Sequence, residues 1–172
     1  MTAPPGRWAT TAEIAEAVSA GRVTARNVTE AALERIARIN PQINAFTDVT
    51  QSRALAEADR IDAERAAGRA LGPLAGVPFA VKNLFNIEGL PTRAGSKINR
   101  EHPPATSDAE LIRRLNAAGA ILVGALNMGE YAYDFTGENS HYGPSRNPHN
   151  PEHMAGGSSG GSAMVTVSPQ PG

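Results

Sequence analysis

The stretch Ala120-Ile121-Leu122-Val123-Gly124-Ala125 is apolar at every position, and a shorter apolar run, Phe79-Ala80-Val81, precedes it and ends in Lys82. Short, continuous apolar runs are typical of strands that are buried on both faces of a sheet. Between the two runs lie a loop-like segment, residues 85–104, and an amphipathic pattern over residues 107–119 that predicts a helix. Strand, loop, helix and strand in this order is the βαβ pattern. The sequence therefore predicts an α/β fold with a mixed, mostly parallel sheet covered by helices.

Helical patterns fill most of the chain before the first apolar run. The predicted elements are a helix capped by Thr10 or Thr11 that ends before Gly21, a helix from near Thr24 to about Asn40 that Pro41 stops, a strand over residues 43–49, and a helix from Gln51 to about Ala67. In the 107–119 helix the expected buried stripe consists of Leu111, Ile112, Leu115 and Ala118. No linker composition or internal repeat interrupts the pattern, so we expect one domain.

The composition excludes several classes of protein. The chain has 172 residues with 41% hydrophobic and 19% charged residues, which is a globular profile, and it has no cysteine. A net charge of −1 does not favour nucleic-acid binding, which is indicated by a basic patch or stripe. No apolar run reaches the ~18 residues of a membrane span, and the N-terminus lacks the apolar region of a secretion signal. We expect a cytoplasmic protein without nucleic-acid or membrane contacts, and no residue implies a metal, flavin or nucleotide cofactor.

Lys82 is the first residue that could do chemistry. Burial at the end of a strand lowers the pKa of a lysine, and a neutral amine can act as a general base. The alternative is a strand-edge lysine whose amine extends to solvent.

A second candidate is the loop Gly156-Gly157-Ser158-Ser159-Gly160-Gly161-Ser162. Its glycines allow the backbone to approach a ligand closely, and its N–H groups can surround an anion. The alternative is a flexible Gly/Ser linker. A serine hydroxyl needs an adjacent base, and Ser–Lys pairs are a known solution, so the Lys82 strand and this loop could meet at the carboxyl edge of the sheet.

Other polar residues are assigned structural roles. His149 and His153 are four residues apart, but Pro151 between them prevents a shared helix face. The scattered acidic residues Asp48, Glu130 and Asp134 show no paired-carboxylate spacing, so we interpret them as structural.

Six motifs together resemble the amidase-signature family, in the order and spacing of that family. They are residues 74–85, 95–97, 108–109, 118–128 with 130–131, 143–148 and 156–162. The resemblance extends from about Ala12 to Ala163 and implies the N-terminal part of the amidase-signature fold. Within the family, residues 95–100 and 124–133 most resemble members that hydrolyse 1-carboxybiuret, and next the glutaminase subunits of tRNA-dependent amidotransferases.

The resemblance also implies a site. Such enzymes use a Ser–Ser–Lys triad, in which Lys82 matches the base and Ser158 matches the middle serine that relays the proton and follows a cis peptide bond. The loop positions matched are Gly157, Ser159, Gly160, Gly161 and Ser162, for which local hydrogen bonding to the backbone is the alternative. Tyr131 is expected to line the substrate cleft or to be an ordinary rim aromatic.

The sequence departs from the family at its end. The attacking serine and its oxyanion hole are expected beyond residue 172, and residues 164–172 are β-branched and proline-bearing where the family has an Ala/Gly-rich helix. Ser168 lies too close to Ser158 to replace the attacking serine. We therefore expect a partial domain that is inactive and poorly soluble alone.

Three functions remain open at this stage. The first is an amidase acting on a small linear amide such as 1-carboxybiuret, and the second is the glutaminase subunit of a tRNA-dependent amidotransferase. The third is a non-catalytic fragment of a disrupted gene. For the first, the resemblance implies a small-molecule amide substrate and either a small companion subunit or a homo-oligomer.

Overall fold

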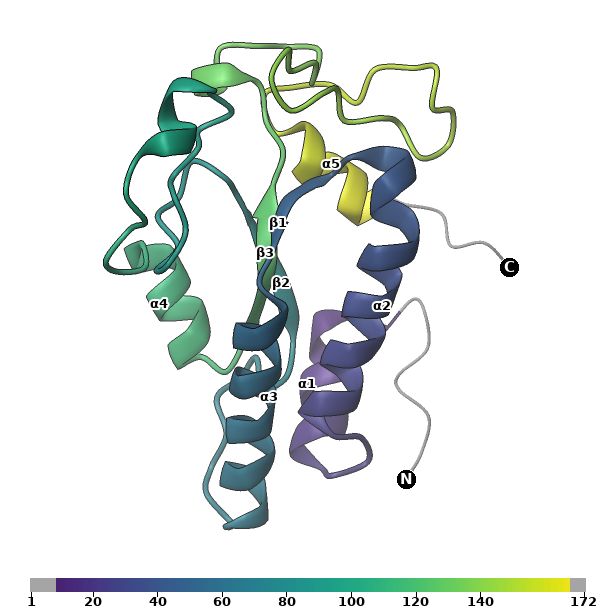
Figure 1. Cartoon of the computed structure of the whole chain (residues 1–172). Coiled ribbons are helices and arrows are strands. Elements are labelled where there is room, and N and C mark those ends of the chain that lie inside the picture. Colours follow the sequence, from purple (N-terminus) through teal and green to yellow (C-terminus); the bar gives the residue numbers. More distant parts are fainter. Residues whose placement is uncertain (1–8, 168–172) are drawn as a thin grey trace. The chain divides into compact units, whose positions relative to one another are not determined.

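The computed structural model describes residues 9–167 as five α-helices, two 3₁₀ turns and three strands. Figure 1 shows these elements in chain order. Their bounds are α1 Thr11–Ser19, α2 Ala25–Ile43, β1 Phe46–Val49, α3 Gln51–Ala66, β2 Pro78–Lys82, a 3₁₀ turn Ile98–Glu101, α4 Glu110–Ala117, β3 Ile121–Leu126, a 3₁₀ turn Glu130–Ala132, and α5 Gly160–Val167.

The chain divides into two compact units that alternate along the sequence. The first unit takes in the chain up to Arg35 together with Thr50–Phe79 and Glu110–Val123. The second unit takes in Ile36–Val49, Ala80–Ala109 and the chain from Gly124 onward.

In the first unit, a carboxylate near the end of one helix holds the start of another. Asp62 of α3 accepts hydrogen bonds from the backbone N–H groups of Ala25 and Arg26, which open α2. These N–H groups have no partner within their own helix, so the side chain of α3 caps α2. At the start of α1, Thr10 and Glu13 form a capping box.

The strands form a three-stranded sheet of order β1-β3-β2 (Figure 1). β1 is antiparallel to the central strand β3, with Phe46 opposite Leu126 and Val49 opposite Gly124. All six residues of β3 are buried, as expected for a central strand of an apolar run. The sheet and its helices confirm the predicted α/β class.

The junction between α2 and β1 differs from the prediction. Pro41 lies inside α2, which continues to Ile43, and the strand starts at Phe46 instead of residue 43. A proline in the last turn removes a single N–H donor, so two more residues can still follow the helical path. Asn44 then adopts a left-handed conformation with φ 49°, which ends the helix and starts the strand.

The predicted buried stripe of the 107–119 helix is only partly correct. Ile112 of α4 is fully buried, but Leu111 is 44% exposed. Leu111 and Ile112 are adjacent in α4 and point about 100° apart around the helix, so Leu111 lies at the edge of the face that buries Ile112. Leu115 and Ala118 are half-buried. Burial is therefore concentrated on Ile112.

The C-terminal residues that depart from the family pattern are helical as far as Val167. Met164 lies within α5 and is buried. Residues 168–172, including Ser168, lie outside the described residues. Among residues 9–167, no helix is long and apolar enough to cross a membrane.

Candidate active site

Lys82 and Ser158 are joined by a hydrogen bond in the second unit. The Lys82 Nζ lies 2.7 Å from the Ser158 Oγ, although the two residues are 76 positions apart in the chain. The sequence predicts that the strand lysine and the Gly-rich loop could meet at the carboxyl edge of the sheet. The structure brings these two residues together there, since Lys82 is the last residue of β2.

The electrostatic setting of Lys82 suits a base. Burial lowers the pKa of the Lys82 amine below its usual value, because a charged ammonium loses solvation there. The lowered pKa increases the fraction of Lys82 that is a neutral amine at a given pH. A neutral amine at 2.7 Å can accept the proton of the Ser158 hydroxyl.

Asn83 fixes the position of Lys82. Its backbone N–H donates to the carbonyl of Leu126, at the end of β3, over 3.0 Å. Its side chain is buried, with Oδ1 accepting from the Gly95 N–H and Nδ2 donating to the Thr47 hydroxyl. The residue that follows the base is thus tied to β1, to β3 and to the loop around Gly95.

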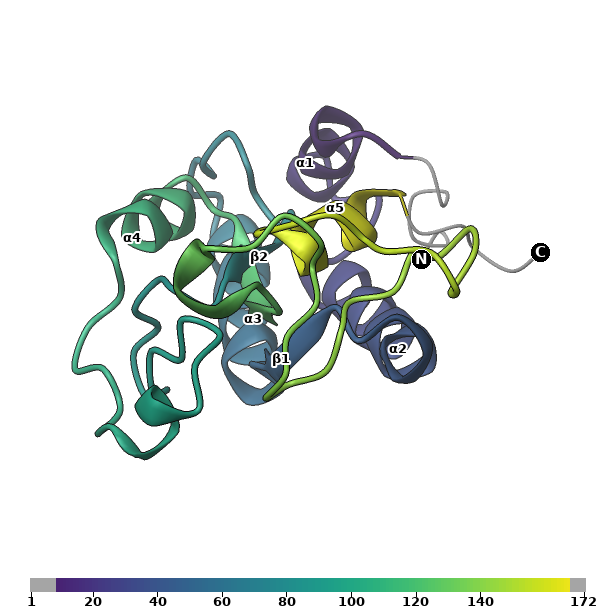
Figure 2. The ribbon, with the colours of Figure 1, turned by 90° about the horizontal axis from the view of Figure 1, so that it is seen from above.

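Ser158 is held by contacts on both sides. The Gly157–Ser158 peptide bond is cis, as the family resemblance implies. The carbonyl of Ser158 accepts a hydrogen bond from the Gly129 N–H at 3.0 Å. Three residues later, the Gly161 N–H donates to the carbonyl of Asn127 over 3.0 Å. Figure 2 looks onto this edge of the sheet, where α5 begins.

Gly161 has no space for a side chain. A Cβ at this position would lie 2.4 Å from the Ala45 carbonyl oxygen and 2.8 Å from both the N and the O of Asn127. These are backbone atoms of the residue before β1 and the residue after β3, so α5 approaches the ends of these strands this closely because position 161 is glycine.

The remaining loop residues do not contact Lys82 through any hydrogen bond found among the described residues. Ser159 is exposed and its carbonyl accepts from the Ala163 N–H, as in a helix start. Ser162 is half-buried in the first turn of α5. Gly160 is buried and packs near Ser145. Their part in substrate binding is therefore a proposal and not a result of this geometry.

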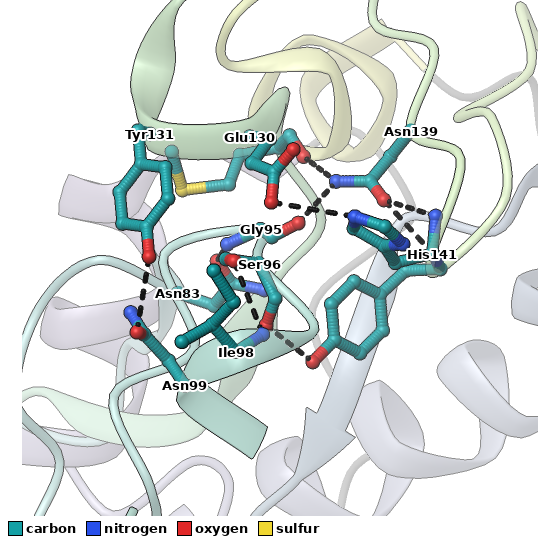
Figure 3. Close-up of polar contacts among 11 residues, drawn as sticks. Asn83, Gly95, Ser96, Ile98, Asn99, Glu130, Tyr131, Asn139 and His141 are labelled. Carbon is teal, nitrogen blue, oxygen red and sulfur yellow. Dashed lines mark hydrogen bonds and ion pairs between the residues drawn. The ribbon is translucent and has the colours of Figure 1, made fainter.

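Tyr131 lies two residues after Gly129, which contacts Ser158. The residue is 54% exposed, its backbone φ is 48°, and its hydroxyl donates to Asn99 Oδ1 over 3.2 Å (Figure 3). A left-handed tyrosine is uncommon and costs conformational energy, so the surrounding loop must hold it. The Tyr131 N–H donates to the Ala94 carbonyl and supplies part of that support.

The three acidic residues of the sequence analysis each have a separate partner. Asp48 binds the Arg93 guanidinium through both carboxylate oxygens, at 2.6 and 2.9 Å. The Glu130 Oε1 lies 3.3 Å from the His141 Nε2. Figure 3 shows this pair. Asp134 accepts from backbone and hydroxyl groups of its own loop. They form no carboxylate pair, in agreement with the sequence analysis.

Buried asparagines were missed by the sequence analysis. Asn127 donates from Nδ2 to the carbonyls of Asn44 and Gly143. Asn139 donates to the carbonyls of Gly95 and Met128 (Figure 3). One signal could have identified Asn127: like Asn83, it is a polar residue close to the end of an apolar strand. Asn139 lies in a loop and carries no such signal.

Comparison with known proteins shows the family of this chain. The family model described as amidase matches residues 27–168. The chain belongs to the amidase family. The predicted family membership is confirmed, and the Lys82–Ser158 pair lies inside the matched range.

Two curated relatives represent different activities. The AtzE subunit of 1-carboxybiuret hydrolase from Pseudomonas sp. (strain ADP) is 59% identical over 160 residues, which cover 93% of this chain and 35% of the relative. The GatA-type relative, the A subunit of glutamyl-tRNA(Gln) amidotransferase from Streptomyces avermitilis, is 45% identical over 159 residues, which cover 92% of this chain and 32% of the relative. The order of the two identities agrees with the sequence analysis.

A solved structure confirms the fold. It is described as an unexpected vestigial protein complex that reveals the evolutionary origins of an s-triazine catabolic enzyme. It superposes with a TM-score of 0.89 at 60% identity, covering 91% of this chain and 34% of that chain. The amidase chain described here thus spans 35% or less of the lengths of these relatives.

Proposed function

We propose that this amidase chain provides the base and the proton relay for hydrolysis of a C–N bond in a small linear amide, with 1-carboxybiuret as the first candidate substrate. The observation that carries the proposal is the 2.7 Å contact between Lys82 Nζ and Ser158 Oγ, with the Lys82 amine partly withdrawn from solvent. The 59% identity to a 1-carboxybiuret hydrolase subunit supports the choice of substrate.

The proposed chemistry moves one proton along the pair. Neutral Lys82 accepts the proton of the Ser158 hydroxyl while Ser158 accepts the proton of the attacking serine. The attacking serine forms an acyl-enzyme with the amide carbonyl, and Lys82 returns a proton through Ser158 to the leaving nitrogen. Water then attacks the acyl-enzyme and gives a proton through Ser158 to Lys82. Lys82 returns this proton through Ser158 to the attacking serine as the acid is released. In this proposal the attacking serine belongs to a segment C-terminal to Gly172.

The substrate would lie beside the Gly-rich loop and Tyr131. Gly157, Ser159, Gly160, Gly161 and Ser162 surround Ser158 in the chain, and they are proposed to line the substrate site, while the oxyanion hole is expected in the segment that carries the attacking serine. Tyr131 is proposed to line the cleft because its ring is exposed and its loop contacts Ser158 through Gly129.

A second candidate function is the glutaminase activity of an amidotransferase. The 45% identity to the glutamyl-tRNA(Gln) amidotransferase relative favours it, and it would use the same Lys82–Ser158 relay on the side-chain amide of glutamine. The two functions differ in substrate, so one protein assayed with both amides separates them.

The test uses a hybrid enzyme. Residues 1–163, over which the family resemblance runs, are joined to the remaining C-terminal part of the Pseudomonas AtzE protein. Ammonia release from 1-carboxybiuret and from glutamine is then measured for the hybrid and for the 172-residue chain alone. We expect the hybrid to hydrolyse 1-carboxybiuret and the chain alone to be inactive.

Matched variants test the relay. Lys82→Ala and Ser158→Ala should each abolish the hybrid's activity. Lys97→Ala changes the other lysine of the sequence, which is exposed, and Ser52→Ala changes an exposed serine of α3; both should leave the activity intact. An active Lys82→Ala hybrid would refute the base role, and faster glutamine hydrolysis would favour the second candidate.

A further inference from the structure

The loop after Tyr133 is folded by a single carboxylate. Asp134 Oδ1 accepts hydrogen bonds from the Thr136 N–H at 2.9 Å and from the Thr136 hydroxyl at 2.6 Å. Its Oδ2 accepts from the Gly137 N–H at 2.8 Å. An aspartate that binds the backbone two and three residues ahead fixes a tight turn, and here it fixes residues 134–137.

The same turn holds the segment that leads to Ser158. The Gly156 N–H donates to the carbonyl of Thr136 at 3.0 Å, and the Gly157 N–H donates to the carbonyl of Phe135 at 2.9 Å. Both acceptor carbonyls belong to the turn that Asp134 folds. The backbone immediately before Ser158 therefore takes its position from this turn.

The Asp134 side chain also fills the space beside two glycines that contact Ser158: Gly157, which precedes it in the chain, and Gly129, whose N–H binds its carbonyl. A Cβ on Gly157 would lie 2.4 Å from Asp134 Oδ2. A Cβ on Gly129 would lie 2.4 Å from Asp134 Cβ and 2.5 Å from its Oδ2. Gly129 is also the residue whose N–H binds the Ser158 carbonyl. The Asp134 side chain thus lies beside the residue that precedes Ser158 and beside the residue that binds the Ser158 carbonyl.

From this arrangement we propose that Asp134 is a positioning residue for Ser158, which holds the serine hydroxyl within hydrogen-bond distance of Lys82. The catalytic meaning of this role rests on the proposed function, but the geometric role does not. Burial opposes ionisation of Asp134, yet hydrogen bonds from Thr136, Gly137 and Phe135 together lower the pKa of its carboxyl group. The group that folds the turn is therefore an anion at neutral pH.

The first test needs no activity. The 172-residue chain contains two lysines, Lys82 and Lys97, so ¹³Cε-labelled lysine gives two side-chain signals. Ser158→Ala shows how far the Lys82 signal moves when its partner is removed. We expect Asp134→Ala to move the chemical shift of the Lys82 signal most of the way to its value in Ser158→Ala, and to leave the chemical shift of Lys97 unchanged. Glu138→Ala changes an exposed carboxylate of the same loop and should move neither signal. A native Lys82 signal in folded Asp134→Ala would overturn the proposal.

Two further variants keep the test decisive if Asp134→Ala does not fold, as judged by circular dichroism. Asp134→Asn keeps the shape and one acceptor oxygen, and we expect an intermediate shift of the Lys82 signal. Gly129→Asp combined with Asp134→Gly places a carboxylate in the same space from the other side. Gly129 has φ −62° and ψ 144°, which any residue adopts. Restoration of the Lys82 signal, relative to Asp134→Gly alone, supports the proposal, and no restoration contradicts it.

The hybrid enzyme provides the catalytic readout. We expect Asp134→Asn to lower kcat by about tenfold to a hundredfold with little change in KM, because a small displacement of a reacting group costs rate and not substrate binding. Unchanged kcat in Asp134→Asn, in a hybrid that Lys82→Ala inactivates, would overturn the Asp134 proposal and leave the proposed function intact. If the hybrid with native residues is inactive, the proposed function fails and the lysine signals alone decide the role of Asp134.

Discussion

Replacement of Gly161 by alanine should destabilise the chain, whereas the same replacement at the preceding Gly160 should not. A Cβ at position 161 would lie 2.4 Å from the Ala45 carbonyl oxygen and 2.8 Å from two backbone atoms of Asn127. A Cβ at position 160 meets its nearest atoms at 3.2–3.3 Å, and two of these belong to the Ser145 side chain. The two glycines are adjacent in the first turn of α5, so they form a matched pair.

The magnitude follows from the contacts. Overpacking against atoms that cannot move freely costs roughly 1–3 kcal/mol. Both variants gain helix propensity, by at most about 1 kcal/mol for glycine to alanine, so this gain largely cancels in the comparison. We therefore expect the free energy of unfolding of Gly161→Ala to be roughly 1–3 kcal/mol lower than that of Gly160→Ala.

Urea unfolding of the purified chain, followed by circular dichroism at the helix band, measures the difference. With a slope of roughly 1–3 kcal/mol per M, the midpoint of Gly161→Ala should lie about 1 M lower. Equal midpoints, or a higher midpoint for Gly161→Ala, would refute the close approach of α5 to the ends of β1 and β3.

Three other predictions concern pH, an ion pair and a helix cap. In the hybrid enzyme, kcat should rise with pH and level off below the usual lysine value of 10.5, because burial lowers the pKa of Lys82 and the base must be neutral; a rate that falls as pH rises through this range would contradict the base role. A double-mutant cycle with Asp48→Asn and Arg93→Met should give a coupling free energy of roughly 1–3 kcal/mol in urea unfolding, because both side chains are largely buried and bind through two hydrogen bonds; a coupling below about 0.5 kcal/mol would show that the pair contributes as little as a surface ion pair. Thr10→Ala should cost about 1 kcal/mol in the same assay, since the Thr10 hydroxyl accepts the free N–H of Glu13, and an unchanged midpoint would contradict the cap.

The sequence was sufficient to predict the features that depend on local patterns. The apolar run at residues 120–125 predicts β3, and the threonines at positions 10 and 11 predict the start of α1, which Thr10 caps. The meeting of Lys82 and Ser158 was also predicted, because a strand-end lysine and a Gly-rich serine loop suit one edge of an α/β sheet.

Features that depend on distant contacts were not predicted. Pro41 was expected to stop a helix that continues to Ile43, since a proline in the last turn removes only one N–H donor. Leu111 fits an apolar stripe by spacing, but α4 buries only one side of that stripe. Asp134 was interpreted as structural, but its place beside Gly129 and Gly157 was not predicted, because it arises only when residues 129, 134 and 157 are brought together.

The Lys82–Ser158 hydrogen bond has a consequence for the order of events in folding. It closes a loop of 76 positions that contains α4, β3 and the buried asparagines. Contacts of such long range form after the local helices, because the entropy of loop closure must be overcome before the contact is gained. A refolding chain should therefore acquire helical structure before the Lys82 amine reaches its native environment. The signal of this one lysine would then report when the site, and not merely the helices around it, has assembled.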